Sequence, residues 1–175
     1  MLKYGGREMA EAFRTVRKNT ITIAEEIPAE KYSFRPAAES RSVGELLAHM
    51  AVSPMWQIDV HGSHAAHISY EMFGRRMASA AAAERALASK EDILEALRSD
   101  GERFAAFLAG VTDETLAEDV SFPPPIQPPT KLRFEMLLGV KEHEMHHRAQ
   151  LTVYQRMLGI VPHLTRARQE RAAAR

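Results

Sequence analysis

The feature that most constrains the fold of this chain is a long helical pattern near its C-terminal end. Between about Lys131 and Leu158, the residues of one stripe recur at steps of three and four, the spacing that places side chains on one face of an α-helix. The stripe consists of Met136, Val140, His143, His147, Leu151, Tyr154 and Leu158. Gly159 and Pro162 then end the pattern. Because such a helix gains most of its stability by packing its apolar face, the chain must build a helical core.

Two histidines lie within this apolar stripe. His143 and His147 are four residues apart, so their side chains differ by about 40° around the helix and stack on one face. A polar ring that faces a core needs a partner, which is either a hydrogen-bonding group or a metal ion. One histidine favours the hydrogen bond, whereas two on one face make a metal ion an equally good interpretation. His146 offers an alternative partner for His143. Glu142 and Glu144 are expected to point outward as solvated charges.

An earlier amphipathic helix is predicted to begin at Ser42. Ser42 and Glu45 form the capping box Ser-x-x-Glu ahead of an apolar run. The stripe of this helix consists of Leu46, His49, Ser53, Trp56 and Val60. His49 therefore repeats the pattern of an imidazole at a position that faces the core. Pro54 should kink the helix just beyond His49, because proline lacks a backbone donor and crowds the carbonyl four residues earlier.

Several side chains near these histidines are candidates for lining a small-molecule pocket. Ser53 and Trp56 lie one and two turns beyond His49 on its own stripe. For Trp56, ordinary core packing is an equally good interpretation. Tyr154 and Gln150 are further candidates on the last helix.

Two more segments have the helical pattern. The first runs from about Arg7 to Ile27, with apolar residues at alternating steps of four and three, and Pro28 ends it. The second runs from about Ser89 to Val111 and begins with another capping pair, Ser89 and Asp92. Together with the two histidine-bearing segments, they give four amphipathic helices.

The connections between these helices differ in character. The segment 61–88 is a long crossover between the second and third helices. It contains His61, His64 and His67, whose side chains fan out by about 60° at each step and are interpreted as solvated or loosely packed rather than as ligands. The segment 115–130 contains five prolines and is expected to form an extended, stiff strap on the surface.

Composition limits the classes of function. The 175 residues suit a single domain, 1–175, with a core of about 7–160 and a basic tail, 163–175, that either extends as a helix or frays. The formal net charge is zero, so nucleic acid is not an expected partner. Cysteine is absent, which excludes disulfides, thiolate zinc sites and a protein thiol nucleophile. The chain has neither a long apolar run nor an apolar signal core, so no membrane association is expected. We expect a cytoplasmic location.

Four amphipathic helices without strand-like alternation predict an all-α fold, a four-helix bundle with a longer crossover between helices 2 and 3. If the second and fourth helices adjoin, His49, His143 and His147 converge inside the bundle. Three imidazoles form a catalytic type of metal site, with a coordination position left open for water or substrate. Zinc and nickel suit such ligands, and iron or manganese are also possible, because three nitrogen ligands do not select one metal.

Two stretches of the chain resemble a known family. They are Ser-Val-Gly-Glu-Leu-Leu-Ala-His-Met at 42–50 and His-Glu-Met-His-His-Arg-Ala-Gln-Leu at 143–151, the latter followed by Tyr154, Arg156 and Gly159. With its length and helix order, the chain is similar to the DinB/YfiT-like family of bacterial metal-dependent enzymes. Ala149 stands where many members carry glycine, a change that should not affect metal ligation.

The resemblance implies a bundle, often a homodimer, in which three histidines hold a divalent metal ion. The histidine of the second helix maps to His49, and the His-x-x-x-His pair maps to His143 and His147. The family is functionally mixed. Some relatives are thiol S-transferases or isomerases that use bacillithiol, mycothiol or glutathione. The histidines of the variable segment 61–67 inherit no role from the resemblance.

Three functions are therefore considered. The leading hypothesis is a metal-dependent S-transferase or isomerase that acts on a small electrophile with a low-molecular-weight thiol. The sulfur must come from a cofactor because the chain contains no cysteine. The second hypothesis is a metal-dependent hydrolase, which would need a general base, and no compelling carboxylate lies on the stripes. The third is a non-enzymatic stress-response or small-molecule-binding bundle. In each case the partner is a small molecule.

Overall fold

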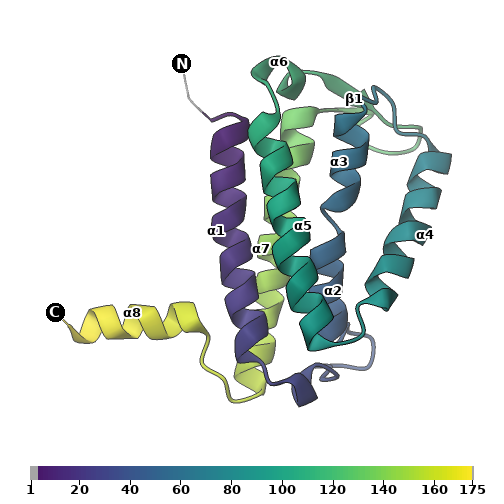
Figure 1. Ribbon diagram of the computed structural model, residues 1–175. Helices are drawn as coiled ribbons and strands as arrows, with labels where there is room; N and C mark the ends of the chain where they lie inside the picture. The colour runs from purple at the N-terminus through teal and green to yellow at the C-terminus, as the bar shows by residue number, and fades with distance from the viewer. Residues whose placement is uncertain (1–3, 175) are drawn as a thin grey trace.

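The computed structural model describes residues 4–174, and these build the four-helix bundle that the sequence predicts (Figure 1). The bundle consists of α1 (Gly6–Glu26), the broken pair α2 (Val43–Val52) and α3 (Met55–Gly62), α5 (Lys90–Gly110) and α7 (Arg133–Met157). The remaining elements are a 3-10 turn (Ala29–Lys31), α4 (Tyr70–Ala86), α6 (Asp113–Leu116), β1 (Asp119–Ser121), β2 (Thr130–Leu132) and α8 (His163–Ala173). Among residues 4–174, no helix combines the length and apolar character that crossing a bilayer requires.

The bundle is arranged so that α1 and α2 each pack against both α5 and α7. One apolar cluster lies between α1, α5 and α7, where the rings of Phe13 and Phe104 meet edge to face with centroids 4.9 Å apart. A second cluster joins α1, α2, α5 and α7 around Leu47, Leu97 and Leu151, all fully buried. Burying each such side chain contributes roughly 1.5–3 kcal/mol. The contact between α2 and α7 is the one that positions the histidines.

The predicted caps form, but the predicted kink is a break. Ser42 accepts from the backbone of Glu45, whose carboxylate accepts in turn from the backbone of Ser42. Ser89 and Asp92 make the same reciprocal pair at the start of α5. At Pro54 the helix stops and restarts, because proline cannot continue the hydrogen-bond ladder.

The segment 115–130 contains structure that the sequence did not predict. β1 and β2 form a short antiparallel ladder in which Val120 pairs with Lys131. Because of this ladder, α7 begins at Arg133 rather than at the predicted Lys131. The chain between the two strands remains an irregular strap, as its five prolines suggest. The tail is helical, and α8 points away from the bundle (Figure 1).

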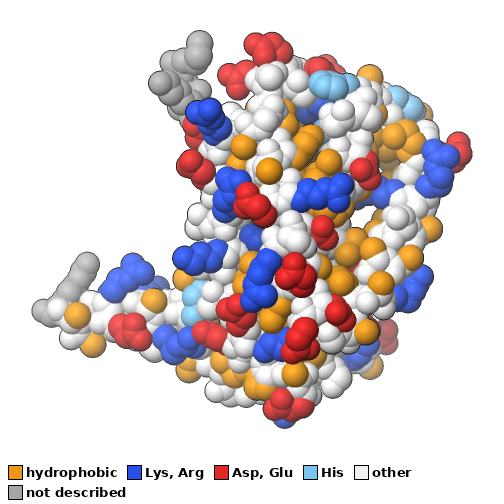
Figure 2. All heavy atoms as spheres, viewed as in Figure 1, with side chains coloured by type: hydrophobic (Ala, Val, Ile, Leu, Met, Phe, Trp, Pro, Cys, Tyr) orange, Lys and Arg blue, Asp and Glu red, His pale blue; other side chains and the backbone are white. Residues whose placement is uncertain are grey.

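Helix α4 lies beside the bundle and contributes no buried residue to it. Its alanine-rich sequence explains this placement, because small side chains favour helix but offer little apolar area to bury. Figure 2 shows this face of the molecule hollowed between α5 and α4. Two cavities therefore flank α3, and Arg76 of α4 contributes to both.

Candidate metal centre

The structure brings His49, His143 and His147 together on facing helices. His49 comes from α2, and the other two occupy successive turns of α7. The Nε2 atom of His143 lies 3.2 Å from Nε2 of His49 and 3.0 Å from Nε2 of His147. One nitrogen from each ring lies within 4.8 Å of the other two, and all three side chains are half-buried. The three rings thus surround a single point.

Two of the rings have a fixed outer partner. His49 Nδ1 lies 2.8 Å from a carboxylate oxygen of Glu84, which comes from α4. The other oxygen of Glu84 accepts a hydrogen bond of 2.9 Å from Arg41. His147 Nδ1 lies 2.8 Å from the side-chain oxygen of Gln150. Because an oxygen acceptor requires a proton on Nδ1, the Nε2 atoms of His49 and His147 carry lone pairs in the neutral rings.

This arrangement leaves more lone pairs than protons at the centre. Burial, with the charges of neighbouring histidines adding to it, lowers the pKa of His143 to about 4, and burial lowers the pKa of His147. Neutral His143 can donate one proton from Nε2, which satisfies only one of its two neighbours. Nitrogen ligands about 2.05 Å from a tetrahedral zinc ion lie about 3.3 Å apart, close to the observed separations. The donor set therefore fits a divalent transition-metal ion.

A cavity of about 500 Å³ adjoins the histidines. His49 and His143 form part of its wall, and the rest comes from α3, α4, α7 and the proline-rich strap. Ser53 and Trp56, the predicted pocket residues of the second helix, line this cavity. Tyr154 lies elsewhere, in the core, where its ring meets Phe34 edge to face. Tyr154 is not among the residues that line this cavity, and its hydroxyl donates to the backbone carbonyl of Arg41.

The family follows from a comparison with known sequences. The model of the DinB superfamily matches residues 12–151, which include all three histidines. The chain belongs to the DinB superfamily. A comparison with curated proteins gives no match.

Two solved structures from Bacillus subtilis share the DinB fold with this chain. The DinB-like protein YjoA is 24% identical, with a TM-score of 0.66 over 87% of this chain and 92% of its own. YfiT is 16% identical, with a TM-score of 0.71 over 91% of each chain. YfiT is described as "a probable metal-dependent hydrolase with an unusual four-helix bundle topology". At these identities the two structures establish the fold alone.

Glu144 of the histidine motif is buried, whereas it was predicted to point outward as a solvated charge. Glu144 is only 2% exposed and forms an ion pair with the equally buried Arg17 of α1. Arg17 also donates to the backbone carbonyls of Leu97 and Met50, at 3.0 and 2.9 Å. Glu142 is exposed, as predicted. The sequence does contain a signal for this buried ion pair. Arg17 follows Phe13 by four residues, so a charged side chain lies on the core-facing stripe of α1.

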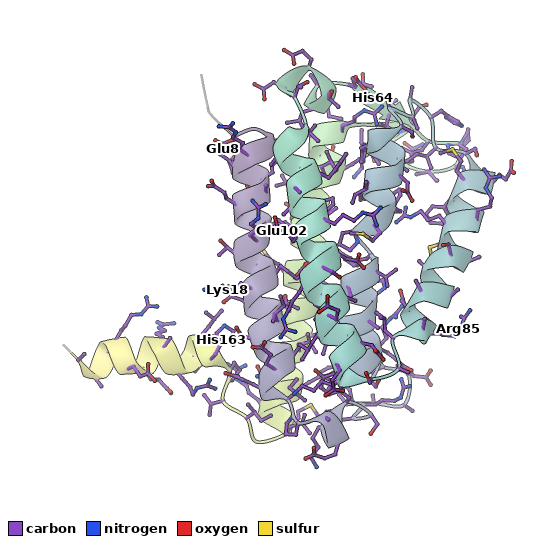
Figure 3. The ribbon with its side chains drawn as sticks, viewed as in Figure 1. Glu8, Lys18, His64, Arg85, Glu102 and His163 are labelled. Carbon is purple, nitrogen blue, oxygen red and sulfur yellow. The ribbon has the colours of Figure 1, made fainter. Side chains whose placement is uncertain are left out.

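The crossover histidines divide into two kinds. The prediction was that all three are solvated or loosely packed rather than metal ligands. It is wrong for the environment of His61, which is 1% exposed and contacts Gln57 and Arg133. Burial, together with the charge of Arg133, lowers the pKa of His61 to about 4. His64 and His67 are exposed as predicted, and Figure 3 shows His64 at the end of the bundle opposite to α8. None of these three belongs to the metal centre.

The sequence offered little sign of the outer partners. Glu84 and Arg41 lie in segments without a clear stripe. The contact of Glu84 with His49, and that of Arg41 with Glu84, depend on how α4 folds back over α2. His146 is exposed, with its ring 5.0 Å from that of His147, and it lies outside the group of three converging nitrogens.

Proposed function

We propose that His49, His143 and His147 bind one divalent transition-metal ion and that the protein is an enzyme acting on a small molecule in the adjoining cavity. The observation that carries this proposal is the convergence of three Nε2 atoms, two of which belong to rings whose Nδ1 faces an oxygen acceptor. Three protein ligands leave at least one coordination position open, which is the arrangement of catalytic rather than structural sites. Zinc or nickel suits three imidazoles, and iron or manganese is compatible with them.

We propose transfer of a low-molecular-weight thiol to a small electrophile as the reaction. When bound, a divalent ion supplies Lewis acidity and lowers the pKa of a coordinated thiol, so that thiolate is available at neutral pH. The chain has no cysteine, so the sulfur belongs to a cofactor. Thiol transfer does not require a general base from the protein, which agrees with the carboxylates near the cavity being already paired. Its lining carboxylate, Glu135, lies 2.9 Å from Lys131, and Glu84 is engaged by His49 and Arg41.

Hydrolysis is the second candidate, because the chain shares its fold with YfiT, which is described as a probable metal-dependent hydrolase. Water would then be the nucleophile, and a protein group would have to accept its proton. Glu84 is the carboxylate nearest in contact to the histidines, but its hydrogen bonds to His49 and Arg41 hold it in a positioning role.

Metal analysis and two assays test these proposals. Purified protein should contain close to one equivalent of a transition metal, His143→Ala should lose it, and His64→Ala should retain it. Consumption of monochlorobimane that requires added bacillithiol, mycothiol or glutathione, and that stops after chelation, supports thiol transfer. Chelator-sensitive cleavage of p-nitrophenyl acetate without thiol supports hydrolysis. If zinc and nickel bind equally well to the native protein and to His143→Ala, the metal centre is refuted.

A further inference from the structure

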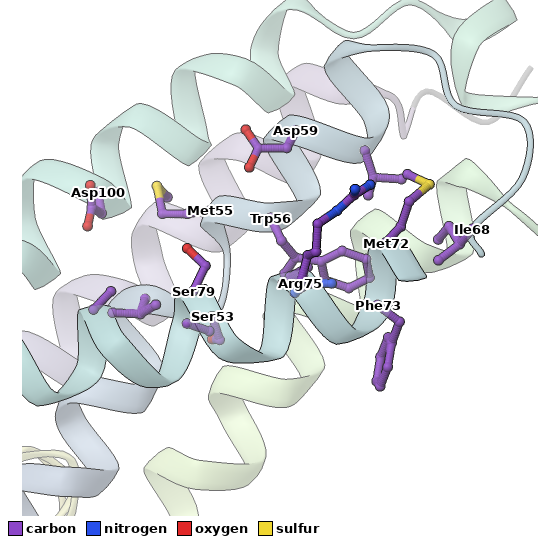
Figure 4. A pocket seen from close by; sticks show the side chains of 15 residues that line it. Ser53, Met55, Trp56, Asp59, Ile68, Met72, Phe73, Arg75, Ser79 and Asp100 are labelled. Atoms are coloured by element: carbon purple, nitrogen blue, oxygen red, sulfur yellow. The ribbon is translucent and has the colours of Figure 1, made fainter. Parts of the chain in front are cut away.

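A second cavity, of about 430 Å³, lies on the other side of α3, between α3, α4 and α5 (Figure 4). Its walls are mostly apolar side chains, including Met55, Trp56, Val60, Ile68 and Met72. The cavity exists because α4 presents small residues here, among them Ser79, Ala80 and Ala83, which do not fill the space opposite α3. Such a space suits an apolar molecule of modest size.

Arg76 belongs to the walls of both cavities. Ser53 and Trp56 are also shared, so the apolar cavity and the cavity beside the histidines meet at these three side chains. The guanidinium of Arg76 stacks on the ring of Trp56. Its Nε atom is buried without a hydrogen-bond partner, and no ion pair joins Arg76 to the other residues in the described range 4–174. A buried donor without a partner is costly, so a ligand atom would satisfy it.

The charges near Arg76 leave it largely uncompensated. Burial lowers the pKa of Arg76, and the charge of Asp59 opposes this effect only in part. Arg75, which also lines this cavity, is already paired with Glu71 at 2.7 Å, and both side chains are exposed. Asp100, whose pKa burial raises, lies at the opposite end of the cavity from Ile68 (Figure 4). The Arg76 guanidinium can therefore pair with one negative charge of a ligand, which favours a ligand with a single negative charge over a doubly charged one.

We propose that the apolar cavity binds the hydrocarbon part of a small monocarboxylate whose carboxylate is held by the Arg76 guanidinium. A planar guanidinium matches a carboxylate with two parallel hydrogen bonds, and Trp56 fixes its plane by stacking. Because Arg76 stands where the two cavities meet, the same molecule can extend a reactive group toward the histidines. Only that last statement rests on the proposed function, since binding of the carboxylate needs no metal ion.

The single tryptophan of the chain provides the measurement. Trp56 touches both cavities, so its fluorescence should change when a ligand enters. We would titrate metal-free full-length protein with 4-phenylbutyrate and, in parallel, with its uncharged analogue 4-phenylbutyramide. The carboxylate should bind about tenfold or more tightly than the amide, because a hydrogen-bonded charge pair is lost in the amide complex.

Three variants identify the group that recognises the charge. Arg76→Gln should remove the preference for the carboxylate, and Arg76→Lys should retain part of it, because the charge remains but the bidentate geometry does not. Arg85→Gln is the matched control, since Arg85 is exposed, lies on the same helix and lines neither cavity. Because α4 contributes no buried residue, Arg76→Gln should fold, and circular dichroism would verify that it does.

The outcome separates this inference from the metal centre. Equal affinity for carboxylate and amide in the native protein would overturn it, as would a preference that survives Arg76→Gln. A preference that appears only after zinc is added and persists in Arg76→Gln would mean that the carboxylate binds the metal, and the inference would again fail. A preference that depends on Arg76 in protein that binds none of zinc, nickel, iron and manganese would uphold this inference while refuting the proposed function.

Discussion

At the scale of single residues, the histidines depend on partners that hold their outer nitrogens. Glu84 is the clearest case, because it accepts from His49 and is itself held by Arg41. Burial acts to raise the pKa of Glu84, but the hydrogen bonds from His49 and Arg41 prevail and lower it. Glu84 is therefore ionised at neutral pH, and a carboxylate on Nδ1 increases the basicity of a ligating imidazole.

Replacement of Glu84 should weaken metal binding without unfolding the protein. In Glu84→Gln the charge is lost, so His49 becomes a poorer ligand, and zinc affinity should fall by about tenfold to a hundredfold. Competition with a chromophoric zinc chelator would measure the change. Glu71→Gln on the same helix, where Glu71 pairs with the exposed Arg75, should keep the native affinity. Matching affinities in the two variants would mean that Glu84 has no positioning role.

The buried pair of Arg17 and Glu144 should dominate local stability. Glu144→Gln leaves the Arg17 charge buried without its counterion, which typically costs about 3–5 kcal/mol. Urea unfolding would measure the free energy of unfolding. Glu142→Gln, two residues away and exposed, should change it by less than about 0.5 kcal/mol. A loss in Glu144→Gln no larger than in Glu142→Gln would contradict the structural role given to the pair.

At the scale of elements, the break between α2 and α3 is linked to the buried Arg17 of α1. Proline at position 54 cannot donate to the carbonyl of Met50, four residues earlier. Nη2 of Arg17 supplies that hydrogen bond, at 2.9 Å, and Nε of the same guanidinium donates to Glu144 on α7. Since Met50 follows His49 and Glu144 follows His143, Arg17 fixes the two helix segments that present the ligands.

The sequence predicts the helices that hold the histidines better than it predicts the contacts between those helices. Apolar spacing and caps located α1, α5, α7 and the start of α2 to within about two residues, because those signals are local. The same local signals identified His49, His143 and His147 as residues of core-facing stripes. Periodicity gives an angle around one helix but no partner on another, so the burial of Glu144 and His61 was missed. The contact of Glu84 with His49 depends on α4, whose alanines carry no directional pattern.

At the scale of the whole molecule, buried neutral histidines should make stability depend on pH. The folded pKa of His61 is about 4, against about 6.5 in an unfolded chain, so the unfolded state binds more protons between these values. Stability is therefore fully present above about pH 6.5 and is lost as the pH falls toward 4, by on the order of 3 kcal/mol for this group. Urea unfolding of metal-free protein at pH 7.5 and pH 5 should reveal the loss. His61→Gln should reduce the difference between the two pH values, and an unchanged difference would exclude His61 as a cause.

A metal ion held by the three histidines should also stabilise the molecule, because it would join α2 to α7 across the bundle. Zinc at about a hundred times its dissociation constant adds about 2.7 kcal/mol to the free energy of unfolding. For a chain of this size that corresponds to a rise of roughly 5–10 °C in melting temperature. Calorimetry of zinc-loaded and chelated protein at pH 7.5 would measure the rise, and His143→Ala should abolish it. His64→Ala should retain it, because His64 is exposed and lies outside the three-histidine group. An equal rise in His143→Ala would show that zinc stabilises the fold from some other site.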